Sequence, residues 1–224
     1  MAGRQRPRRG QIASRPALTR LAPMCNEFAR EANLEQLAAL FGEVGTLPMF
    51  EWEGGRLPND TEAKDSIRIS DLSPVVRLKD GKLQGAMTPW AWRAPNGRPV
   101  FNFVSEGRDF SKVDRVLIPA TGFYEYTTPA APKVKLKDRH LFTFAGEPWF
   151  WIAGLVRDGA FSMLTTAPGP DVAPFHDRGI VPLKPSHGLA WLDLKGPAVK
   201  VLKPPPAGTL AVRTLRRDGV DLAA

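Results

Sequence analysis

The sequence predicts an α+β domain that is sheet-rich and mostly antiparallel, and two patterns support this prediction. Apolar and polar residues alternate in several short stretches between residues 75 and 166, which is the period of a strand with one buried face. The pairs Asp80-Gly81 and Asp158-Gly159 separate such stretches, and Asp-Gly accepts the positive φ angles of the turn that joins antiparallel strands. A chain of 224 residues can bury one sizeable core, so we expect a single domain over residues 24–224.

The domain is expected to begin near Met24. Residues 1–23 mix Arg, Pro, Gly and small residues without an apolar period, so this basic lead is predicted to be disordered, or to result from an early start assignment. Residues 33–41 place apolar side chains at i, i+3, i+4 and i+7 before Gly42, which predicts a short amphipathic helix with a glycine stop. Residues 43–66 are rich in turn-forming residues and are predicted to form a long loop.

The rest of the domain is predicted to be strands joined by short turns. The predicted strands span 75–78, 82–87, 115–118, 122–126, 134–137, 141–144, 149–156 and 161–166. A second short helix is predicted for residues 186–194, and a last strand for residues 209–214.

The net charge of +8 is concentrated at the N-terminus. Residues 1–24 hold six of the 31 Lys and Arg residues and no acid, so 25 basic residues stand against 23 acidic ones in the remainder. The domain itself therefore carries only about +2. Binding of a nucleic acid would require a local basic patch, because association depends on the electrostatic field at the surface where the nucleic acid binds.

Composition excludes several classes of protein. A single cysteine rules out an intramolecular disulfide and a Cys-rich zinc site, and it is compatible with a reducing cytosol. No segment approaches the roughly 20 apolar residues that cross a bilayer, and arginines interrupt any apolar stretch of the lead, so a secretory signal is not expected. We therefore expect a cytoplasmic protein without a membrane span, a metal or a cofactor.

Four short stretches set polar groups in apolar or turn surroundings. They are Met24-Cys25-Asn26, Phe101-Asn102-Phe103, residues 122–126 (GFYEY) and residues 174–178 (PFHDR). Each has an ordinary structural explanation, since buried polar groups are usually hydrogen-bonded parts of the fold. A free cysteine is often a small core residue, and His176 could simply bond to Asp177.

In combination these stretches resemble the SOS response-associated peptidase (SRAP) family of abasic-site processing proteins. The resemblance spans about residues 24–190 and rests on Met24-Cys25-Asn26, on residues 115–126 (RVLIPATGFYEY) and on the block at 164–178, with Leu-Thr-Thr at its start and His-Asp-Arg at its end. It implies a barrel-like sheet fold and a cysteine that, once the initiator Met is removed, forms a thiazolidine with the ring-opened abasic sugar in single-stranded DNA. The resemblance places the nucleophile on Cys25 and the assisting groups on Asn102, Glu125 and His176.

The residue types fit this chemistry independently of the resemblance. An α-amine has a reference pKa of about 7.7–8.0, so part of it is neutral at pH 7 and can attack an aldehyde. The thiol of an N-terminal cysteine can then close a five-membered ring. Opening the sugar and dehydrating the carbinolamine need proton transfers, for which Glu125 and His176 are the candidates. As a strand residue, Glu125 would share a face with Phe123, whose apolar ring would raise the pKa of the carboxyl, while Asn102 could orient the amine or the sugar without titrating.

The candidate DNA contacts are two tryptophans and three arginines. Trp90 and Trp92, predicted to share a strand face, could stack on a base or pack in the core, and the sequence favours neither. Arg98, Arg108 and Arg178 are candidate phosphate partners. The family commonly has arginines where this chain has Glu27 and Val104, so the DNA-binding residues are less defined than the reaction centre.

Three functions remain open at this stage. The covalent mechanism requires that the functional chain starts at Met24 and loses it, because only then does Cys25 have an α-amine. A thiol hydrolase in which His176 activates Cys25 would not need the amine. A non-covalent single-strand binder would depend on tryptophans and arginines and would show steep salt dependence. The sequence gives no information on oligomeric state.

Overall fold

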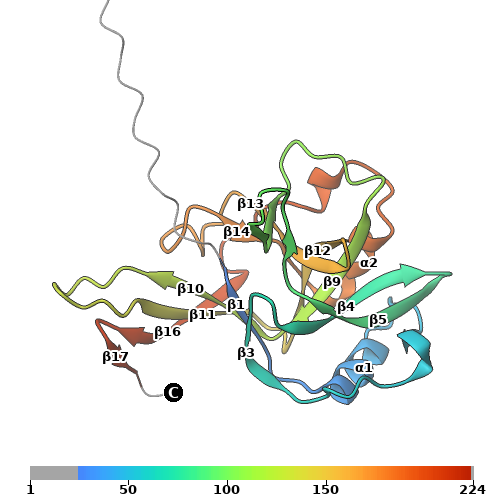
Figure 1. Ribbon diagram of the computed structural model, residues 1–224, viewed down its shortest axis with the longest axis horizontal. Coiled ribbons are helices and arrows are strands. Elements are labelled where there is room, and N and C mark those ends of the chain that lie inside the picture. The colour runs from blue at the N-terminus through green and yellow to red at the C-terminus, as the bar shows by residue number, and fades with distance from the viewer. Residues whose placement is uncertain (1–24, 223–224) are drawn as a thin grey trace, which may run out of the picture.

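The structure is a computed structural model that describes residues 25–222; the predicted basic lead and the predicted start at Met24 lie outside these residues. The strands form a six-stranded sheet, a nine-stranded sheet and a two-stranded pair. The helices α1 (Leu34–Glu43) and α2 (Gly188–Leu192) lie beside the nine-stranded sheet (Figure 1). Almost all strand pairs are antiparallel, and the exceptions are β2 with β5 and β8 with β13. The predicted α+β, sheet-rich fold class is confirmed.

The first sheet has six strands in the order β17-β16-β11-β10-β1-β3. In that order the strands span Val220–Asp221, Leu210–Arg217, Asp138–Phe144, Gly122–Thr127, Glu27–Arg30 and Lys64–Arg68. The N-terminal strand β1 therefore lies inside the sheet, between β10 and β3. The residues that precede β1 are in this way brought beside β10.

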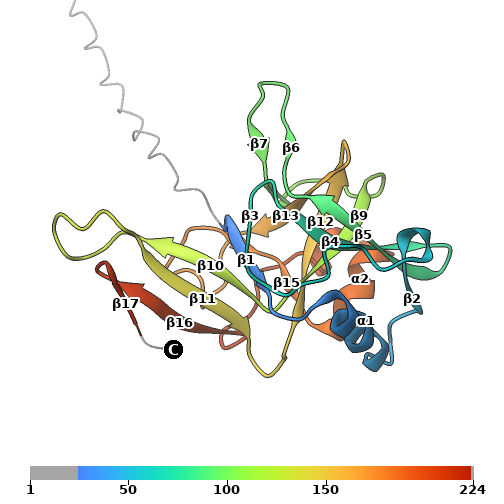
Figure 2. The ribbon, with the colours of Figure 1, turned by 60° about the horizontal axis from the view of Figure 1, so that its bottom comes forward.

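The second sheet has the order β14-β13-β12-β9-β4-β5-β2, with β15 on β12 and β8 on β13. The strands from β14 to β2 span, in that order, Gly179–Ile180, Ala160–Thr166, Phe150–Arg157, Asp114–Ala120, Leu72–Lys79, Lys82–Pro89 and Phe50–Trp52. The two further strands are β15 (Pro182–Leu183) and β8 (Asn102–Val104). A separate two-stranded arm, β6 (Trp92–Arg93) with β7 (Pro99–Val100), projects from the body in Figure 2.

Two core clusters cover opposite faces of the second sheet. Val76 and Trp151 belong to the cluster that includes the helices α1 (Leu34–Glu43) and α2 (Gly188–Leu192). Their neighbours Val75 and Ile152 belong to the cluster that includes Phe123 and Phe142 of the first sheet. Successive side chains of a strand point to opposite faces, so this sheet lies between the helices and the first sheet.

Both predicted Asp-Gly turns are present. Asp80 and Gly81 have φ angles of 50° and 76° between β4 and β5, and Asp158 and Gly159 have 50° and 75° between β12 and β13. Both predicted helices are also present, and Asn33 caps α1 through a capping box with Gln36. The predicted stop at Gly42 was wrong, because α1 continues through Gly42 to Glu43 and is capped at Val44. The second helix was predicted at 186–194 and is shorter, with α2 spanning only Gly188–Leu192. The residues before it form a 3-10 turn at Pro185–His187 instead. Two further 3-10 turns lie at Glu53–Gly55 and Ala198–Lys200.

One strand prediction and one loop prediction were wrong, and several short strands were missed. Residues 134–137 are not a strand, since Lys133 has a φ of 70° and the pairing of β11 with β10 begins only at Asp138. The predicted loop at 43–66 contains β2 and the start of β3. The strands β1, β6, β7, β8, β14, β15 and β17 were not predicted. All of these are two to four residues long, too short to show an alternating pattern.

Trp90 and Trp92 do not share a face. Ala91 has a φ of 84°, which interrupts the alternation, so Trp90 lies in the cluster with Phe123 and Trp92 in the cluster with the helices. The Trp90 indole is fully buried, stacks on Phe161 and donates its N–H to the Phe101 carbonyl at 2.9 Å. Trp92 is also buried. The prediction of a shared face is corrected, and neither ring is exposed for base stacking in this structure.

We expect Trp90→Ala to lower the free energy of unfolding by about 3–5 kcal/mol, because it empties a large, fully packed site. Urea unfolding followed by fluorescence or circular dichroism measures this loss. Trp52→Ala is the control, since Trp52 is only partly buried and packs at the margin of the core. An unchanged stability of the Trp90 variant would contradict the core role.

Candidate active site around Cys25

Cys25 lies where the N-terminal strand enters the first sheet. Phe28 of β1 pairs with Phe123 of β10, and because the strands are antiparallel, the residues before β1 run alongside the end of β10. The Cys25 backbone N–H donates to the Glu125 carboxylate oxygen Oε1 at 3.2 Å. The Cys25 side chain is buried, with 1% exposed, and its thiol contacts the Glu27 carbonyl at 3.7 Å.

Glu125 is a buried carboxyl on an apolar face. As expected, it shares the β10 face with Phe123, whereas Tyr124 and Tyr126 lie on the opposite face. Burial raises the pKa of Glu125 to about 8, the hydrogen bond from Cys25 N–H opposes this shift, and the charge of Asp177 adds to it. Glu125 is therefore largely protonated at neutral pH and suited to donate a proton.

Asn102 holds the other side of the Cys25 main chain. It begins β8, which runs parallel to β13 with Asn102 opposite Met163. The Asn102 amide Nδ2 donates to the Cys25 carbonyl at 3.1 Å. The N–H and the carbonyl of Cys25 are thus each bound by one of the predicted site residues, separated by 100 and 77 positions in the sequence.

His176 lies in a loop that packs against the first sheet. The preceding Phe175 ring lies 4.7 Å from the His140 ring and 5.2 Å from the Phe142 ring, measured between centroids, which fixes the loop against β11. His176 Nδ1 lies 3.1 Å from the Arg178 N–H and 2.9 Å from Asp177 Oδ1. The two contacts need different forms of the ring. Nδ1 accepts from the Arg178 N–H when it carries no hydrogen, and it donates to the Asp177 carboxylate when it carries one.

The Cys25 thiol is held in its protonated form. Burial raises its pKa well above the ordinary value, and the nearby carboxyls of Glu125 and Glu27 add to the shift, while hydrogen bonds with the backbone of Glu27 and Tyr124 oppose it. A thiolate, not a thiol, is the nucleophile of cysteine hydrolases. The environment of Cys25 therefore does not activate the thiol for direct attack.

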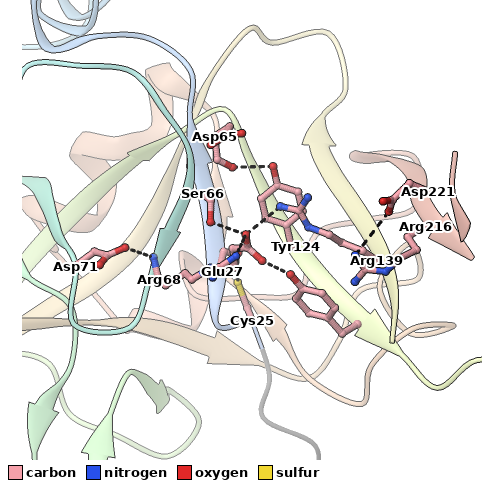
Figure 3. Close-up of polar contacts among 11 residues, drawn as sticks. Cys25, Glu27, Asp65, Ser66, Arg68, Asp71, Tyr124, Arg139, Arg216 and Asp221 are labelled. Carbon is pink, nitrogen blue, oxygen red and sulfur yellow. Dashed lines mark hydrogen bonds and ion pairs between the residues drawn. The ribbon is translucent and has the colours of Figure 1, made fainter. Parts of the chain in front are cut away.

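Glu27 forms a polar cluster on the other face of β1 that the sequence did not predict. Figure 3 shows its carboxylate beside Cys25, between Ser66 and Arg68 on one side and Arg139 on the other. The Ser66 hydroxyl donates to Glu27 at 2.6 Å, Arg139 at 2.9 Å, and the Tyr126 hydroxyl also donates to it. The Arg139 guanidinium additionally lies 3.9 Å from the centroid of the Tyr124 ring. These partners come from three strands, β3, β10 and β11, so no local pattern in the sequence could reveal the cluster.

The predicted phosphate partners differ in their surroundings. Arg178 makes a bidentate ion pair with Glu106, with distances of 2.8 and 2.7 Å, and donates to the Thr165 carbonyl. The hydrogen bonds from Arg178 lower the pKa of Glu106 to about 2, so Glu106 is ionised and Arg178 is engaged. Arg98 is exposed on the β6–β7 arm, and Arg108 lies over the Phe103 ring. Their roles in DNA binding stay predictions.

The described part of the chain contains no cluster of three or more His, Cys, Asp or Glu residues arranged to hold a metal ion. Within residues 25–222, neither helix has the length and apolar character needed to span a bilayer.

The sequence matches the family described as SOS response associated peptidase (SRAP) over residues 24–218. The chain belongs to the SRAP family. A relative from Bacillus subtilis (strain 168), the abasic site processing protein YoaM, is 31% identical over 187 residues, which cover 77% of this chain and 80% of the relative.

Solved structures show the same fold at lower identity. A protein from Bacteroides thetaiotaomicron has a TM-score of 0.63 and 17% identity, covering 87% of this chain and 93% of its own. A phage-related protein from Bordetella bronchiseptica has a TM-score of 0.62 and 23% identity, covering 86% and 95%. A second protein from Bordetella bronchiseptica has a TM-score of 0.60 and 19% identity, covering 86% and 100%.

Proposed function

We propose that this protein processes abasic sites in DNA by capturing the lesion covalently. In this proposal, a chain that begins at Cys25 forms a thiazolidine with the ring-opened abasic sugar of single-stranded DNA. The observation that carries the proposal is the hydrogen bond of 3.2 Å between the Cys25 nitrogen and the raised-pKa carboxyl of Glu125. Family membership and the relative named as an abasic site processing protein support the substrate class.

The proposed reaction begins at the nitrogen of Cys25. As a free α-amine, this nitrogen attacks the aldehyde carbon of the open sugar and gives a carbinolamine. Glu125 donates a proton to the departing hydroxyl and takes up the proton of the nitrogen, so that water leaves and a neutral imine remains. The thiol then adds through sulfur to the imine carbon, and its proton passes to the nitrogen. The products are one thiazolidine and one water molecule, so no oxidant, metal or cofactor is needed.

The other residues hold and move protons in this scheme. Asn102 fixes the Cys25 carbonyl at 3.1 Å and so sets the direction of the attacking nitrogen. His176 is proposed to act as acid and base in opening the sugar ring, since its ring has partners for both the neutral and the charged state. A thiol that stays protonated suits the ring closure, because it brings its own proton to the nitrogen.

The competing proposal of a thiol hydrolase is less well supported by this geometry. It needs a Cys25 thiolate, whereas burial and two nearby carboxyls disfavour the thiolate. The contacts of Cys25 with Glu125 and Asn102 are made by its main chain rather than by its sulfur. These main-chain contacts support a reaction at the nitrogen of Cys25 rather than at its sulfur.

One experiment separates the candidate functions. Chains beginning at Cys25 and at Met1 are each incubated with a single-stranded oligonucleotide, with or without an abasic site, and run on a denaturing gel. We expect a shifted, denaturation-resistant band only for the chain beginning at Cys25 and only with the abasic site. An equal band from a verified chain that retains residues 1–24 would refute the thiazolidine. Binding seen only on native gels would indicate the non-covalent binder.

A further inference from the structure

A pocket between the start of α2 and a run of three prolines has no place in the reaction described above. None of Cys25, Asn102, Glu125 and His176 lines it. Its volume is about 430 Å³, within the range of about 300–1,000 Å³ that is usual for ligand sites. The buried part of its lining is apolar and consists of Phe144, Pro182, Leu183 and Pro205. The bottom of the pocket therefore suits an apolar group.

The opening of the pocket is positively charged. Lys184, Lys200 and Lys203 line it and are exposed, and no Asp or Glu within residues 25–222 lines it. Lys184 faces Glu147 at 3.7 Å, which neutralises part of its charge. Lys200 and Lys203 take part in none of the ion pairs between described residues. Because the domain as a whole is nearly neutral, this local excess of positive charge attracts an anionic ligand.

The proline wall of the pocket, residues 204–206, is held at both ends. Before the prolines, Leu202 is buried in the core cluster that includes the helices. After them, the Asp171 carboxylate accepts the N–H groups of Gly208 and Leu210, each at 2.9 Å. Each proline ring also restricts φ of its own residue to a narrow range. This wall therefore has little freedom to collapse into the pocket.

The opposite wall is the segment that leads into α2. The Trp151 indole N–H donates to the Pro185 carbonyl at 3.1 Å. Gly188 lies directly against the same indole, since a β-carbon at this position would come within 2.7 Å of the ring. Both walls are thus fixed by the core. A pocket that is already formed loses little conformational entropy when it binds a ligand.

These features favour a peptide over a small anion or a nucleic acid. A small ligand is oriented by polar groups inside its site, whereas the buried lining here is apolar and the prolines have no N–H to donate. Single-stranded nucleic acids stack their bases on aromatic side chains, but Phe144 is the only Phe, Tyr or Trp that lines the pocket, and it is 6% exposed. An apolar centre within a charged margin is typical of a protein interface with one anchoring side chain.

We propose that this pocket docks an acidic peptide segment of a partner protein. One aromatic or large aliphatic side chain of the peptide packs on Phe144 and Leu183, and carboxylates on either side of it pair with Lys184, Lys200 and Lys203. The residues proposed to act at Cys25 do not line the pocket, so the docked peptide does not occupy the Cys25 site. The pocket is a means of recruiting this protein to a partner, separate from its contacts with DNA.

The first test uses a fluorescein-labelled peptide with one phenylalanine flanked on both sides by glutamates, and measures binding by anisotropy. We expect saturable binding by the full chain. Lys200→Ala/Lys203→Ala should bind about tenfold more weakly, within the range for the loss of two exposed ion pairs. Lys79→Ala/Lys112→Ala removes the same charge from two exposed lysines outside the pocket and should bind like the parent. No saturable binding by the parent, or equal losses in the two double variants, would overturn the proposal.

A second test separates the apolar contact from the charge. Ala190 is exposed on α2 and lines the pocket, so Ala190→Trp fills the space without changing the charge. We expect this variant to bind the peptide about tenfold more weakly. The parent should bind a peptide with serine in place of phenylalanine about ten- to a hundredfold more weakly, because one buried aromatic side chain is lost. Circular dichroism verifies the fold of the variant. Full affinity in either case would indicate attraction by charge alone and would overturn the anchored peptide.

A third measurement distinguishes a peptide from a nucleic acid as the occupant. The affinity for an undamaged single-stranded oligonucleotide is compared between the parent and Ala190→Trp, and we expect it to be equal. A loss of oligonucleotide affinity as large as the loss of peptide affinity would assign the pocket to nucleic acid and overturn the proposal. None of these measurements uses an abasic site, so their outcome does not depend on the covalent reaction at Cys25.

Discussion

Replacing Cys25 by Ala in a chain that begins at residue 25 is expected to abolish every denaturation-resistant adduct with an abasic oligonucleotide. The α-amine remains and can form an imine, but without the thiol the imine cannot close to a thiazolidine and hydrolyses on denaturation. Quantifying the shifted band on a denaturing gel, without added reductant, measures the loss. The fold should persist, because the change removes one sulfur atom from a buried side chain. Thermal unfolding followed by circular dichroism verifies this.

A matched control separates the roles of the amine and the thiol. Adding one glycine before Cys25 keeps the thiol and the fold but converts the α-amine to an amide. We expect this chain to form no adduct either. If it retained full activity while Cys25→Ala lost it, the thiol alone would be responsible, and thiazolidine formation would be refuted.

Glu125→Gln is expected to slow adduct formation by about 10²- to 10⁴-fold, the usual contribution of a general acid. Gln keeps the size of the side chain and can still accept the Cys25 N–H, but it cannot donate a carboxylic proton. A time course with abasic oligonucleotide gives the rate. Glu106→Gln is the control, because that carboxylate pairs with Arg178 and has no contact with the Cys25 nitrogen. Equal rates in the parent and Glu125→Gln would remove Glu125 from the mechanism.

The same substitution should change how stability depends on pH. The folded protein keeps the Glu125 proton up to a pKa of about 8, whereas the ordinary value is 4.5. Between these values the folded state binds more protons than the unfolded state, so this residue makes stability fall as pH rises, by at most about 1.4 kcal/mol per unit. Urea unfolding of the chain with residue 24 retained, at pH 5 and pH 8.5, measures the change. Glu125→Gln should lose less stability over this interval, and an identical loss in both chains would contradict the buried, protonated carboxyl.

The elements predicted most accurately were those specified by neighbouring residues. The helix predicted at 33–41 is present as α1 at 34–43 because its apolar spacing is a local pattern, although its predicted stop at Gly42 was wrong. The hairpins at Asp80-Gly81 and Asp158-Gly159 were predicted because the turn itself requires positive φ angles. The face of Glu125 followed from the alternation along β10. In each case the information is local.

The elements that were missed depend on distant partners. Strand β1 is four residues long and exists because β10 and β3 pair with it on both sides. Trp90 and Trp92 were predicted to share a face because the alternation was assumed to continue, and the φ of 84° at Ala91 breaks it. Short strands and single strained residues leave no periodic signal in the sequence.

The sequence by itself determined the fold class, the family resemblance and the residue types that the proposed chemistry needs at positions 25, 102, 125 and 176. Tertiary structure decided that Glu125 and Asn102 bind the nitrogen and the carbonyl of Cys25, that the thiol stays protonated, and that Glu27 holds two arginines. The physical reason is that hydrogen bonds, burial and pKa shifts depend on groups up to 112 residues apart in the chain. Residue type and local periodicity, by contrast, can be read from neighbouring positions of the sequence.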